Sequence, residues 1–453
     1  MEHRPNISVL RPKIYEQIDP EFRQDMMPGL FGKYLQYGRD PDKVNLGHGY
    51  PDMDVPQFLK DSLVEVMSKT INHQYSRPAG PLGLAEELSK VYSPRLLRHV
   101  DPVTEIIVSN GATELYSSLI NLMTKSGDEI IYFEPCYAFF IPLMYTKGRK
   151  GVPISVINGD GLALNREKFE AAFSPRTKII AINSPHNPTG KVFTKEEVEY
   201  MCEFLRTKYP DVLVISDDVY CDFPFGSHVH TQIAAQPGMW NRTITLFSLG
   251  KVFGTTGWRL GVGIGPQPIV EALATYQTLQ VYCGNTPISM AAERSLRIAR
   301  TQPYKGEENY FIWLRKTFES KAEKIFAIFQ NSGLDLITLK CEGGYFLTAK
   351  IDKAILKIPV RYFYNDYETN TSRTQRLTKF EEWRNLVDPD FSPDYAYCNY
   401  LAIEKKIVCW PISAFYDTAF KKPKEKKQVN MIRMAICRSE ESIVRLAEAL
   451  KAN

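Results

Sequence analysis

The sequence lacks the usual signatures of metal-binding, disulfide-linked and membrane proteins. Its eight cysteines are scattered without a C-x-x-C pair, and its seven histidines form neither an H-E-x-x-H motif nor a cluster with the cysteines. We therefore expect no metal site and no disulfide framework, and most cysteines should be buried free thiols. Apolar runs such as "EIIVSNGATELY" are interrupted well before the roughly 20 residues of a membrane span, so no membrane association is expected.

Excess charge of one sign is also missing. The net charge is only +4 over 453 residues, which gives no support for a nucleic-acid partner. The first twenty residues, "MEHRPNISVLRPKIYEQIDP", contain neither the apolar stretch of a signal peptide nor the acid-poor pattern of a transit peptide, so we expect a cytoplasmic protein. The composition, 44% hydrophobic and 24% charged, is that of a globular protein, and the length favours two domains that share an interface.

What the chain does contain is an alternation of short apolar runs and helical patterns. The runs are "VTEIIVS", "DEIIYFEP", "VPISV", "TKIIAIN", "VLVISDD", "TITLFS" and "GVGIG". Their nearly continuous apolar character is typical of strands buried on both faces, which predicts a mainly parallel sheet covered by helices. Thr194 and Glu197 have the spacing of a capping box that opens one of these helices. We expect a large α/β domain over residues 47–314.

The pattern changes after a helical stretch at about residues 310–330. The runs "GLDLITL", "GGYFLTAKI", "IVCWPI" and "NMIRMAIC" predict strands at longer intervals, and Ser439 is expected to cap the last helix. A smaller α+β domain is therefore expected from residues 1–46 and 315–453. Within it, the polar and aromatic stretch at about 351–393 shows no periodicity, and we interpret it as an inserted surface excursion without an assigned function.

Residues that could bind or react with a ligand, through side chains or through free backbone N–H groups, follow most of the predicted strands of the large domain. They are Ala112 and Thr113 after a glycine at a helix start, then Tyr137, Asn187, Asp217, Tyr220, Ser248, Lys251 and Arg259. Each alone has an ordinary structural explanation, such as core packing, a turn or a helix cap. Ligands of α/β sheets bind beyond the carboxyl ends of the strands, where these side chains would meet. Together they match the needs of a pyridine ring bearing an aldehyde, a phenolic oxygen and a phosphate.

The sequence resembles the class I/II aminotransferases, which are pyridoxal-phosphate-dependent enzymes of fold type I. Within them it is most similar to the kynurenine aminotransferase, glutamine transaminase K and cysteine-conjugate β-lyase group. The motifs are "NLGHGYPD", "HQYSRPAGPLGLAEEL", "SNGATELYSSL", "NSPHNPTGKVF", "ISDDVYCDF", "SLGKVFGTTGWRLG", "NTPISMAAERSL", "GGYFL" and "PISAFY". The resemblance implies a mainly parallel central sheet, a smaller α+β domain and pyridoxal 5′-phosphate as cofactor.

The resemblance also implies a role for each residue around the cofactor ring. Lys251 matches the lysine that forms the Schiff base and later shuttles the proton. Asp217 matches the carboxylate beneath the pyridine nitrogen, whose charge keeps that nitrogen protonated. Asn187 and Tyr220 match donors to the phenolic oxygen. Tyr137 matches the aromatic residue that stacks on the ring.

Further matches concern the cofactor phosphate. Ala112 and Thr113 at the helix start, together with Ser248 and Arg259, match its binding residues, and the planar guanidinium suits two phosphate oxygens. Tyr75 matches a tyrosine that reaches the phosphate bound by a neighbouring subunit. The resemblance therefore implies a homodimer with shared active sites.

For the substrate, the resemblance implies a clamp on the α-carboxylate. Arg433 matches the arginine of that clamp, with Asn187 beside it, and Gly49 matches the loop that closes over the carboxylate. An arginine on a buried strand without an anionic partner would be costly, which favours this interpretation. The implied reaction moves the amino group of an amino acid to a 2-oxo acid with ping-pong kinetics. By kinship the donor would be kynurenine, glutamine, or an aromatic or methionine-like amino acid.

Two alternatives stay open from the sequence. A cysteine-S-conjugate β-lyase would use the same site, expel a leaving group from Cβ and release pyruvate and ammonia. A non-catalytic module would keep the fold for regulation or scaffolding, although fold alone would not require Lys251, Asp217, Asn187 and Arg433 together.

Overall fold

The structure is a computed structural model that describes residues 30–158, 161–364, 368–369, 371–379, 392–416 and 429–451. The first 29 residues of the predicted small domain therefore lie outside the described residues. The same holds for residues 365–367, 370 and 380–391 of the predicted insertion. Within the described parts, no helix combines the length and apolarity needed to cross a membrane.

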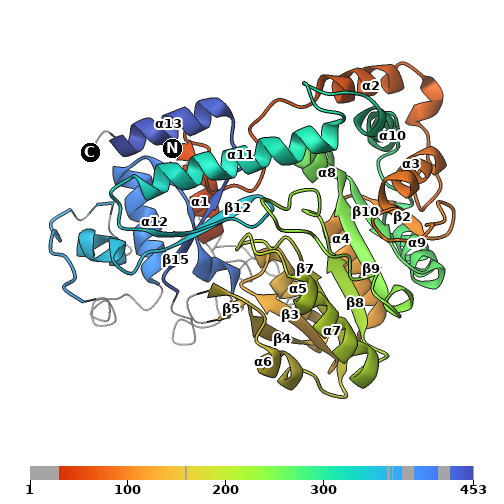
Figure 1. Ribbon diagram of the computed structural model, residues 1–453, viewed down its shortest axis with the longest axis horizontal. Helices are drawn as coiled ribbons and strands as arrows, with labels where there is room; N and C mark the ends of the chain where they lie inside the picture. Colours follow the sequence, from red (N-terminus) through yellow and green to blue (C-terminus); the bar gives the residue numbers. More distant parts are fainter. Residues whose placement is uncertain are drawn as a thin grey trace, which may run out of the picture.

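A seven-stranded sheet forms the centre of the larger part of the molecule (Figure 1). In spatial order its strands are β2 (Ile106–Ser109), β10 (Gly261–Ile264), β9 (Thr243–Ser248), β8 (Leu213–Asp217), β7 (Thr177–Asn183), β3 (Glu129–Glu134) and β4 (Lys150–Ser155). Strand β10 is antiparallel to both of its neighbours, and the other pairs are parallel. All seven apolar runs predicted as strands overlap one of these strands, so the mainly parallel sheet is confirmed.

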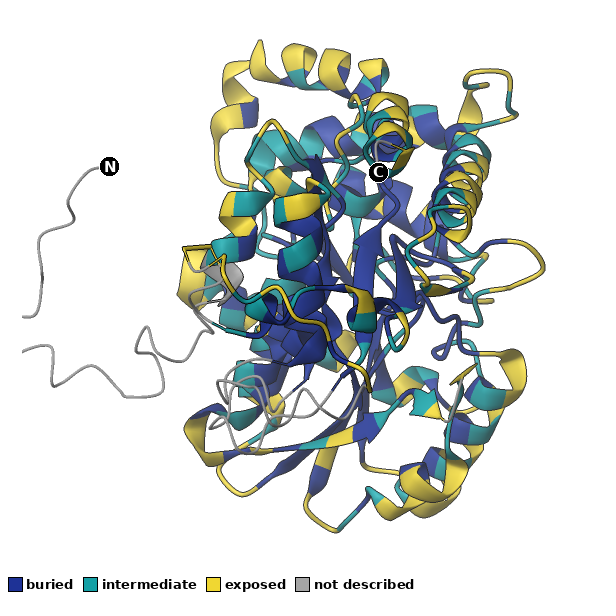
Figure 2. Cartoon of the chain, turned by 90° about the vertical axis from the view of Figure 1, so that its left-hand side faces the viewer, coloured by how far each residue is buried: buried dark blue, intermediate teal, exposed yellow. Residues whose placement is uncertain are grey.

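Helices cover both faces of this sheet because alternate strand residues point to opposite sides. Along β3, Ile130 and Tyr132 pack in one apolar cluster with α4, α5 and α9, whereas Ile131 and Phe133 pack in another with α6 and α7. These helices are α4 (Ala112–Met123), α5 (Ile141–Tyr145), α9 (Gln267–Val281), α6 (Arg166–Ala171) and α7 (Lys195–Lys208). Figure 2 shows the result, with buried strands at the centre and exposed residues on the outer helices.

Local signals in the sequence place several helix starts correctly. Helix α7 opens with the predicted capping box, in which Thr194 Oγ1 accepts from Glu197 N at 3.2 Å and the Glu197 carboxylate accepts from Thr194 N at 2.9 Å. Ser439 Oγ accepts from Ser442 N at 3.1 Å at the start of α13 (Glu440–Lys451), as expected for a cap. These bonds satisfy N–H groups that a helix start leaves without intrahelical partners.

A second, antiparallel sheet lies beside the first and completes the core. Its strands are β11 (Ile337–Leu339), β12 (Phe346–Lys350), β15 (Met431–Ala435) and β14 (Trp410–Pro411). Helix α11 (Tyr310–Gln330) runs from beside α8 (Leu249–Val252) to beside α13 (Figure 1). Strand β1 (Val44–Asn45) pairs with β13 (Ile407–Val408), which fixes the start of the segment that leads to the site.

The remaining helices complete the described part of the fold. They are α1 (Leu30–Tyr37), α2 (Gln57–Met67), α3 (Leu82–Tyr92), α10 (Thr286–Thr301) and α12 (Pro393–Glu404). Helix α10 packs against both α2 and α3. Its apolar residues face them, and Arg297 and Arg300 of α10 pair with the buried carboxylate of Glu87 on α3.

The expected surface excursion is wrong for its first part. Ile351, Ile355, Tyr362 and Phe363 are fully buried in the core, and the last three lie on two short 3₁₀ helices, Ala354–Lys357 and Val360–Phe363. The stretch as a whole is mostly polar, and its apolar residues are not spaced as in a regular helix or strand, so nothing in the sequence indicates that they are buried. Residues 351–364 are therefore part of the smaller half of the fold.

Candidate active site

A cavity of about 400 Å³ lies at the carboxyl ends of the central strands, between the two sheets. All of the predicted site residues except Tyr75 line it. The lining members of the predicted set are Gly49, Ala112, Thr113, Tyr137, Asn187, Asp217, Tyr220, Ser248, Lys251, Arg259 and Arg433. The structure therefore brings together groups that lie up to 384 residues apart in the sequence (Gly49 to Arg433).

The strand register explains this convergence. Asn183 at the end of β7 lies opposite Asp217 at the end of β8, so the two loops start at the same level. Strand β10 runs in the opposite direction, and its first residue, Gly261, pairs with Ser248 at the end of β9. Arg259, two residues before β10, is therefore at the same edge as the groups that follow the parallel strands.

Lys251 lies on the short helix α8 directly after β9. Its Nζ donates to Gly49 O at 3.1 Å and lies 5.4 Å from the ring centroids of Tyr220 and Tyr345. Burial is the main cause that lowers the pKa of Lys251 to about 8; Cys437 and Asp217 oppose the shift, and the charge of Arg433 adds to it. A lysine with a depressed pKa supplies neutral amine near neutral pH and is a competent nucleophile.

Asp217 ends strand β8 and is buried. Burial, and next the neighbouring Asp218, raise its pKa to about 7. Its Oδ1 is buried and accepts no hydrogen bond from the residues that the structure describes. A protonated ring nitrogen placed in the cavity would supply both the donor and the positive charge that this carboxylate lacks.

An anion cradle lies where α4 begins. Gly111 precedes the helix with φ +105°, and a Cβ on it would lie 2.3 Å from Arg259 Nη2. The guanidinium thus uses the space that a side chain would occupy beside the free N–H groups of Ala112 and Thr113. A helix start next to an arginine binds phosphate well, and Ser248 lines the same cavity.

Arg433 comes from β15 and is buried between aromatic rings. Its guanidinium lies 4.1 Å from the ring centroid of Phe346 and 4.5 Å from that of Phe415. Nη1 donates to Asn187 Oδ1 at 3.1 Å and Nη2 to Gly47 O at 2.6 Å. Burial lowers its pKa to about 10, so it stays charged at neutral pH. No carboxylate is bonded to it among the described residues, and a substrate anion can take that place.

Tyr75 lies outside this cavity. Its side chain is 80% exposed, and its ring contacts that of Tyr282 with centroids 4.9 Å apart. This placement is compatible with a reach into another subunit but does not test it. The shared active site stays a prediction.

The sequence reasoning missed most of the apolar wall. Leu35, His48, Tyr50, Phe139, Phe346, Trp410 and Phe415 also line the cavity. The motifs "GGYFL" and "PISAFY" contain Phe346 and Phe415, but no role was assigned to either ring. Trp410 and Leu35 lie outside the recognised motifs. Their place in the cavity depends on how the small sheet and α1 pack, which the sequence does not reveal.

The arrangement fits the cofactor that the sequence implies. A buried carboxylate oxygen without a partner, an anion cradle and a lysine of lowered pKa lie around one cavity, with Tyr137 and Tyr220 lining its walls. Each corresponds to one chemical feature of a pyridine ring with a phosphate and an aldehyde. Among the described residues no cluster of three metal-ligating side chains exists.

Comparison with known proteins agrees with this geometry. Residues 41–450 match the family model "Aminotransferase class I and II". The chain is 31% identical over 413 residues to the kynurenine--oxoglutarate transaminase of Dictyostelium discoideum, a match that covers 88% of this chain and 87% of the relative. It is 30% identical over 436 residues to human kynurenine--oxoglutarate transaminase 3, which covers 93% of this chain and 87% of that one.

Solved structures give the same fold. Bna3p from Saccharomyces cerevisiae, a candidate kynurenine aminotransferase, superposes with a TM-score of 0.79 at 26% identity, covering 98% of both chains. YbdL from Escherichia coli, for which a methionine aminotransferase function was identified, also gives a TM-score of 0.79 at 22% identity. That match covers 98% of this chain and 100% of YbdL, and it supports the fold alone.

Proposed function

Since the chain belongs to the class I and II aminotransferase family, we propose that it is an aminotransferase for amino acids with large apolar or aromatic side chains, of the kynurenine type. Membership makes it an amino-acid aminotransferase that uses pyridoxal 5′-phosphate and 2-oxo acids. The donor preference rests on one observation, the aromatic wall. Phe139, Phe346, Trp410 and Phe415 line the same cavity as Arg433.

Different residues around the cavity would bind different parts of the cofactor. Asp217 would hold the ring nitrogen, Arg259 and the start of α4 would hold the phosphate, and Lys251 would hold the aldehyde group of the cofactor. When bound, the cofactor supplies an electron sink for the Cα–H bond that breaks. Asn187 and Tyr220 would supply side-chain donors to the ring, and Tyr137 would pack against it.

The substrate is held by its carboxylate. Arg433 binds that group, because its charge is buried and the planar guanidinium can bind two oxygens at once. With the carboxylate fixed, the Cα–H bond is brought towards Lys251 Nζ, whose lowered pKa suits it to take and return a proton near neutral pH. Gly49 lies over this region, and its lack of a side chain avoids a clash with the Phe346 ring.

A donor-by-acceptor screen tests the proposed preference. Purified protein is assayed with kynurenine, phenylalanine, methionine, glutamine and aspartate, each against several 2-oxo acids including 2-oxoglutarate. We expect kynurenine or phenylalanine to give the highest kcat/KM, and Trp410→Ala to reduce that preference. A preference for aspartate would refute the proposed donor class. Pyruvate release from a cysteine S-conjugate without any oxo acid would instead reveal the lyase reaction.

We also propose a homodimer in which Tyr75 completes the partner's site. The support is its exposed ring, together with the exposed apolar side chains of Ile71 and Leu279 in neighbouring segments. Light scattering should give twice the chain mass of 51.8 kDa. Mixing inactive Lys251→Ala and Tyr75→Ala proteins should restore part of the activity if subunits exchange and share sites. A monomer with full activity would refute this proposal.

A further inference from the structure

The loop of residues 47–50 is held by positive side chains at four consecutive backbone carbonyls. Gly47 O accepts from Arg433, and Gly49 O accepts from Lys251. The two carbonyls that alternate with these, His48 O and Tyr50 O, both accept from Arg438 Nη2, the latter at 2.7 Å. The loop is therefore fixed between two proposed active-site residues, Lys251 and Arg433, and one further arginine.

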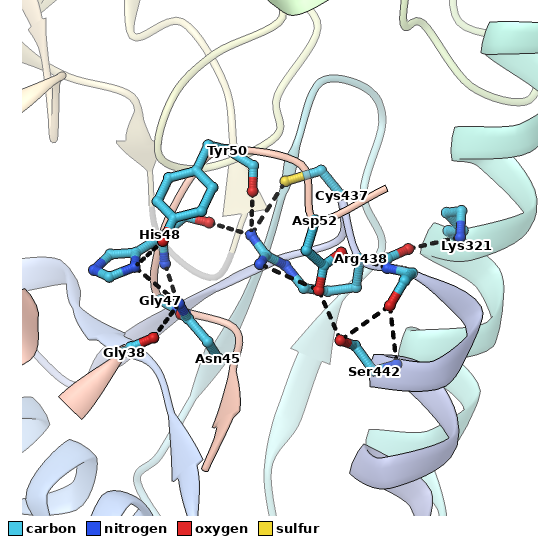
Figure 3. A network of polar contacts seen from close by, with 11 residues as sticks. Gly38, Asn45, Gly47, His48, Tyr50, Asp52, Lys321, Cys437, Arg438 and Ser442 are labelled. Carbon is cyan, nitrogen blue, oxygen red and sulfur yellow. Dashed lines mark hydrogen bonds and ion pairs between the residues drawn. The ribbon is translucent and has the colours of Figure 1, made fainter. Parts of the chain in front are cut away.

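Arg438 lies directly behind this loop and is only 1% exposed (Figure 3). Its Nη1 is 3.7 Å from Asp52 Oδ2, and Asp52 in turn accepts from Ser442 Oγ at 2.7 Å. The backbone carbonyl of Arg438 accepts from the buried Lys321 Nζ at 2.6 Å. Figure 3 shows the guanidinium between the loop on one side and Asp52 with the start of α13 on the other.

Side chains of the loop also contact one another and the segment that precedes the loop. Asn45 Nδ2 donates to Gly38 O at 3.0 Å and also contacts His48 Nδ1 at 2.8 Å. His48 Nδ1 lies 3.0 Å from Tyr50 Oη, and the two rings stack with centroids 5.1 Å apart. Loss of the Arg438 bonds would leave two loop carbonyls without these donors and release the segment as a unit.

We propose that Arg438 is a positioning residue for the substrate site. By holding His48 O and Tyr50 O it places Gly47 O against Arg433 and Gly49 O against Lys251. The orientation of the Arg433 guanidinium, and with it the affinity for the substrate carboxylate, depends on this placement. The inference rests on the proposed role of Arg433 in binding that carboxylate.

The structural alternative is that Arg438 only stabilises the chain. The half-buried Arg242 provides the comparison, because it too donates to backbone carbonyls, those of Val212 and Leu205 at 3.0 Å each. It does not line the cavity. A purely structural role predicts the same behaviour for Arg438→Gln and Arg242→Gln.

The test measures steady-state kinetics and hydrogen exchange on the holoenzyme of both variants. We expect Arg438→Gln to raise KM for the amino acid about tenfold while kcat changes less than about threefold, as for a residue that acts on binding. Amide exchange should accelerate in residues 46–52 and not in the central sheet, and cofactor absorbance should be retained. Arg438→Lys should recover part of the affinity, and Arg242→Gln should leave KM unchanged.

An unchanged KM for Arg438→Gln would overturn the proposal. A rise in exchange spread over the whole chain, as expected of Arg242→Gln, would overturn it equally. If Arg438→Gln does not fold, Arg438→Lys and Asp52→Asn decide, and each must show raised KM and faster exchange at residues 46–52. The exchange result needs no turnover, so it distinguishes failure of this inference from failure of the proposed substrate class.

Discussion

Arg433 Nη1 donates a 3.1 Å hydrogen bond to Asn187 Oδ1, which joins the small sheet to the loop after β7. Because the Asn187 oxygen accepts from Arg433, its amide N–H groups are left to donate into the cavity. The same contact fixes the edge of the guanidinium that a carboxylate would approach. One side-chain pair thus orients a cofactor contact and a substrate contact together.

Replacement of Arg433 should separate substrate binding from cofactor binding. Arg433→Gln removes a buried charge-assisted contact worth about 3 kcal/mol, so KM for the amino acid should rise about 100-fold. Cofactor absorbance should persist, since Asp217, Arg259 and Lys251 are unaltered. Kinetics with one donor and one acceptor, followed over a substrate titration, measure this. An unchanged KM would exclude Arg433 from carboxylate binding.

The buried carboxylate of Asp217 should lower the free energy of unfolding of the apoprotein at high pH. Its folded pKa of about 7 lies above the ordinary 3.8, so stability falls as pH rises between these values, by about 4 kcal/mol in full. Asp217→Asn apoprotein should therefore melt higher than the unmodified apoprotein at pH 8 and similarly at pH 4. Its transamination rate should fall about 1000-fold, because the ring nitrogen loses its counter-charge.

Calorimetry of both apoproteins at the two pH values provides the measurement. Each comparison is made between variants at one pH, so other titrating groups such as Asp394 cancel. Equal melting temperatures at pH 8, or an Asn variant with full activity, would contradict the role of Asp217.

Gly111→Ala should weaken the cofactor through its phosphate. The new Cβ would lie 2.3 Å from Arg259 Nη2 and displace the guanidinium from the cradle. We expect the Kd of pyridoxal 5′-phosphate to rise about 100-fold, the loss of one charge-assisted phosphate contact. Gly127→Ala is the matched control, because Gly127 also has a positive φ, of +85°, with nothing within 4 Å of its Cβ position.

Both alanine variants should lose about 1 kcal/mol of stability from the strained backbone. Only Gly111→Ala should lose cofactor affinity, measured by titrating the apoprotein and following absorbance. Equal affinities in the two variants would show that the cradle does not depend on the space at Gly111.

The central sheet could be predicted from the sequence because its strands are buried on both faces. Runs such as "TKIIAIN" and "VLVISDD" are almost wholly apolar, and the reactive residues follow directly at their ends. Arg259 could also be placed at the site, although the sequence did not reveal that β10 runs antiparallel. Local hydrogen bonds such as those of the Thr194–Glu197 capping box join residues that are close in the sequence, so their spacing alone predicts them.

The parts that escaped prediction depend on contacts between distant segments. Trp410 reaches the cavity because β14 pairs with β15, and Leu35 because α1 packs beside it; no local pattern encodes either event. The burial of residues 351–364 likewise follows from packing against the small sheet. Arg438 has no sequence signature, because its partners are backbone carbonyls and Asp52, which is 386 residues away in the sequence.

The most direct measurement concerns the bond between Lys251 and the cofactor. Holoenzyme is reduced with borohydride, digested and analysed by mass spectrometry, and Lys251→Ala is assayed in parallel with Lys191→Arg as a control at another buried lysine. The account predicts the reduced adduct on the peptide that contains Lys251. It also predicts that transamination falls about 1000-fold or more in Lys251→Ala and not in Lys191→Arg, as expected for a covalent catalytic residue. An adduct on another lysine, or Lys251→Ala with the unmodified rate, would contradict it.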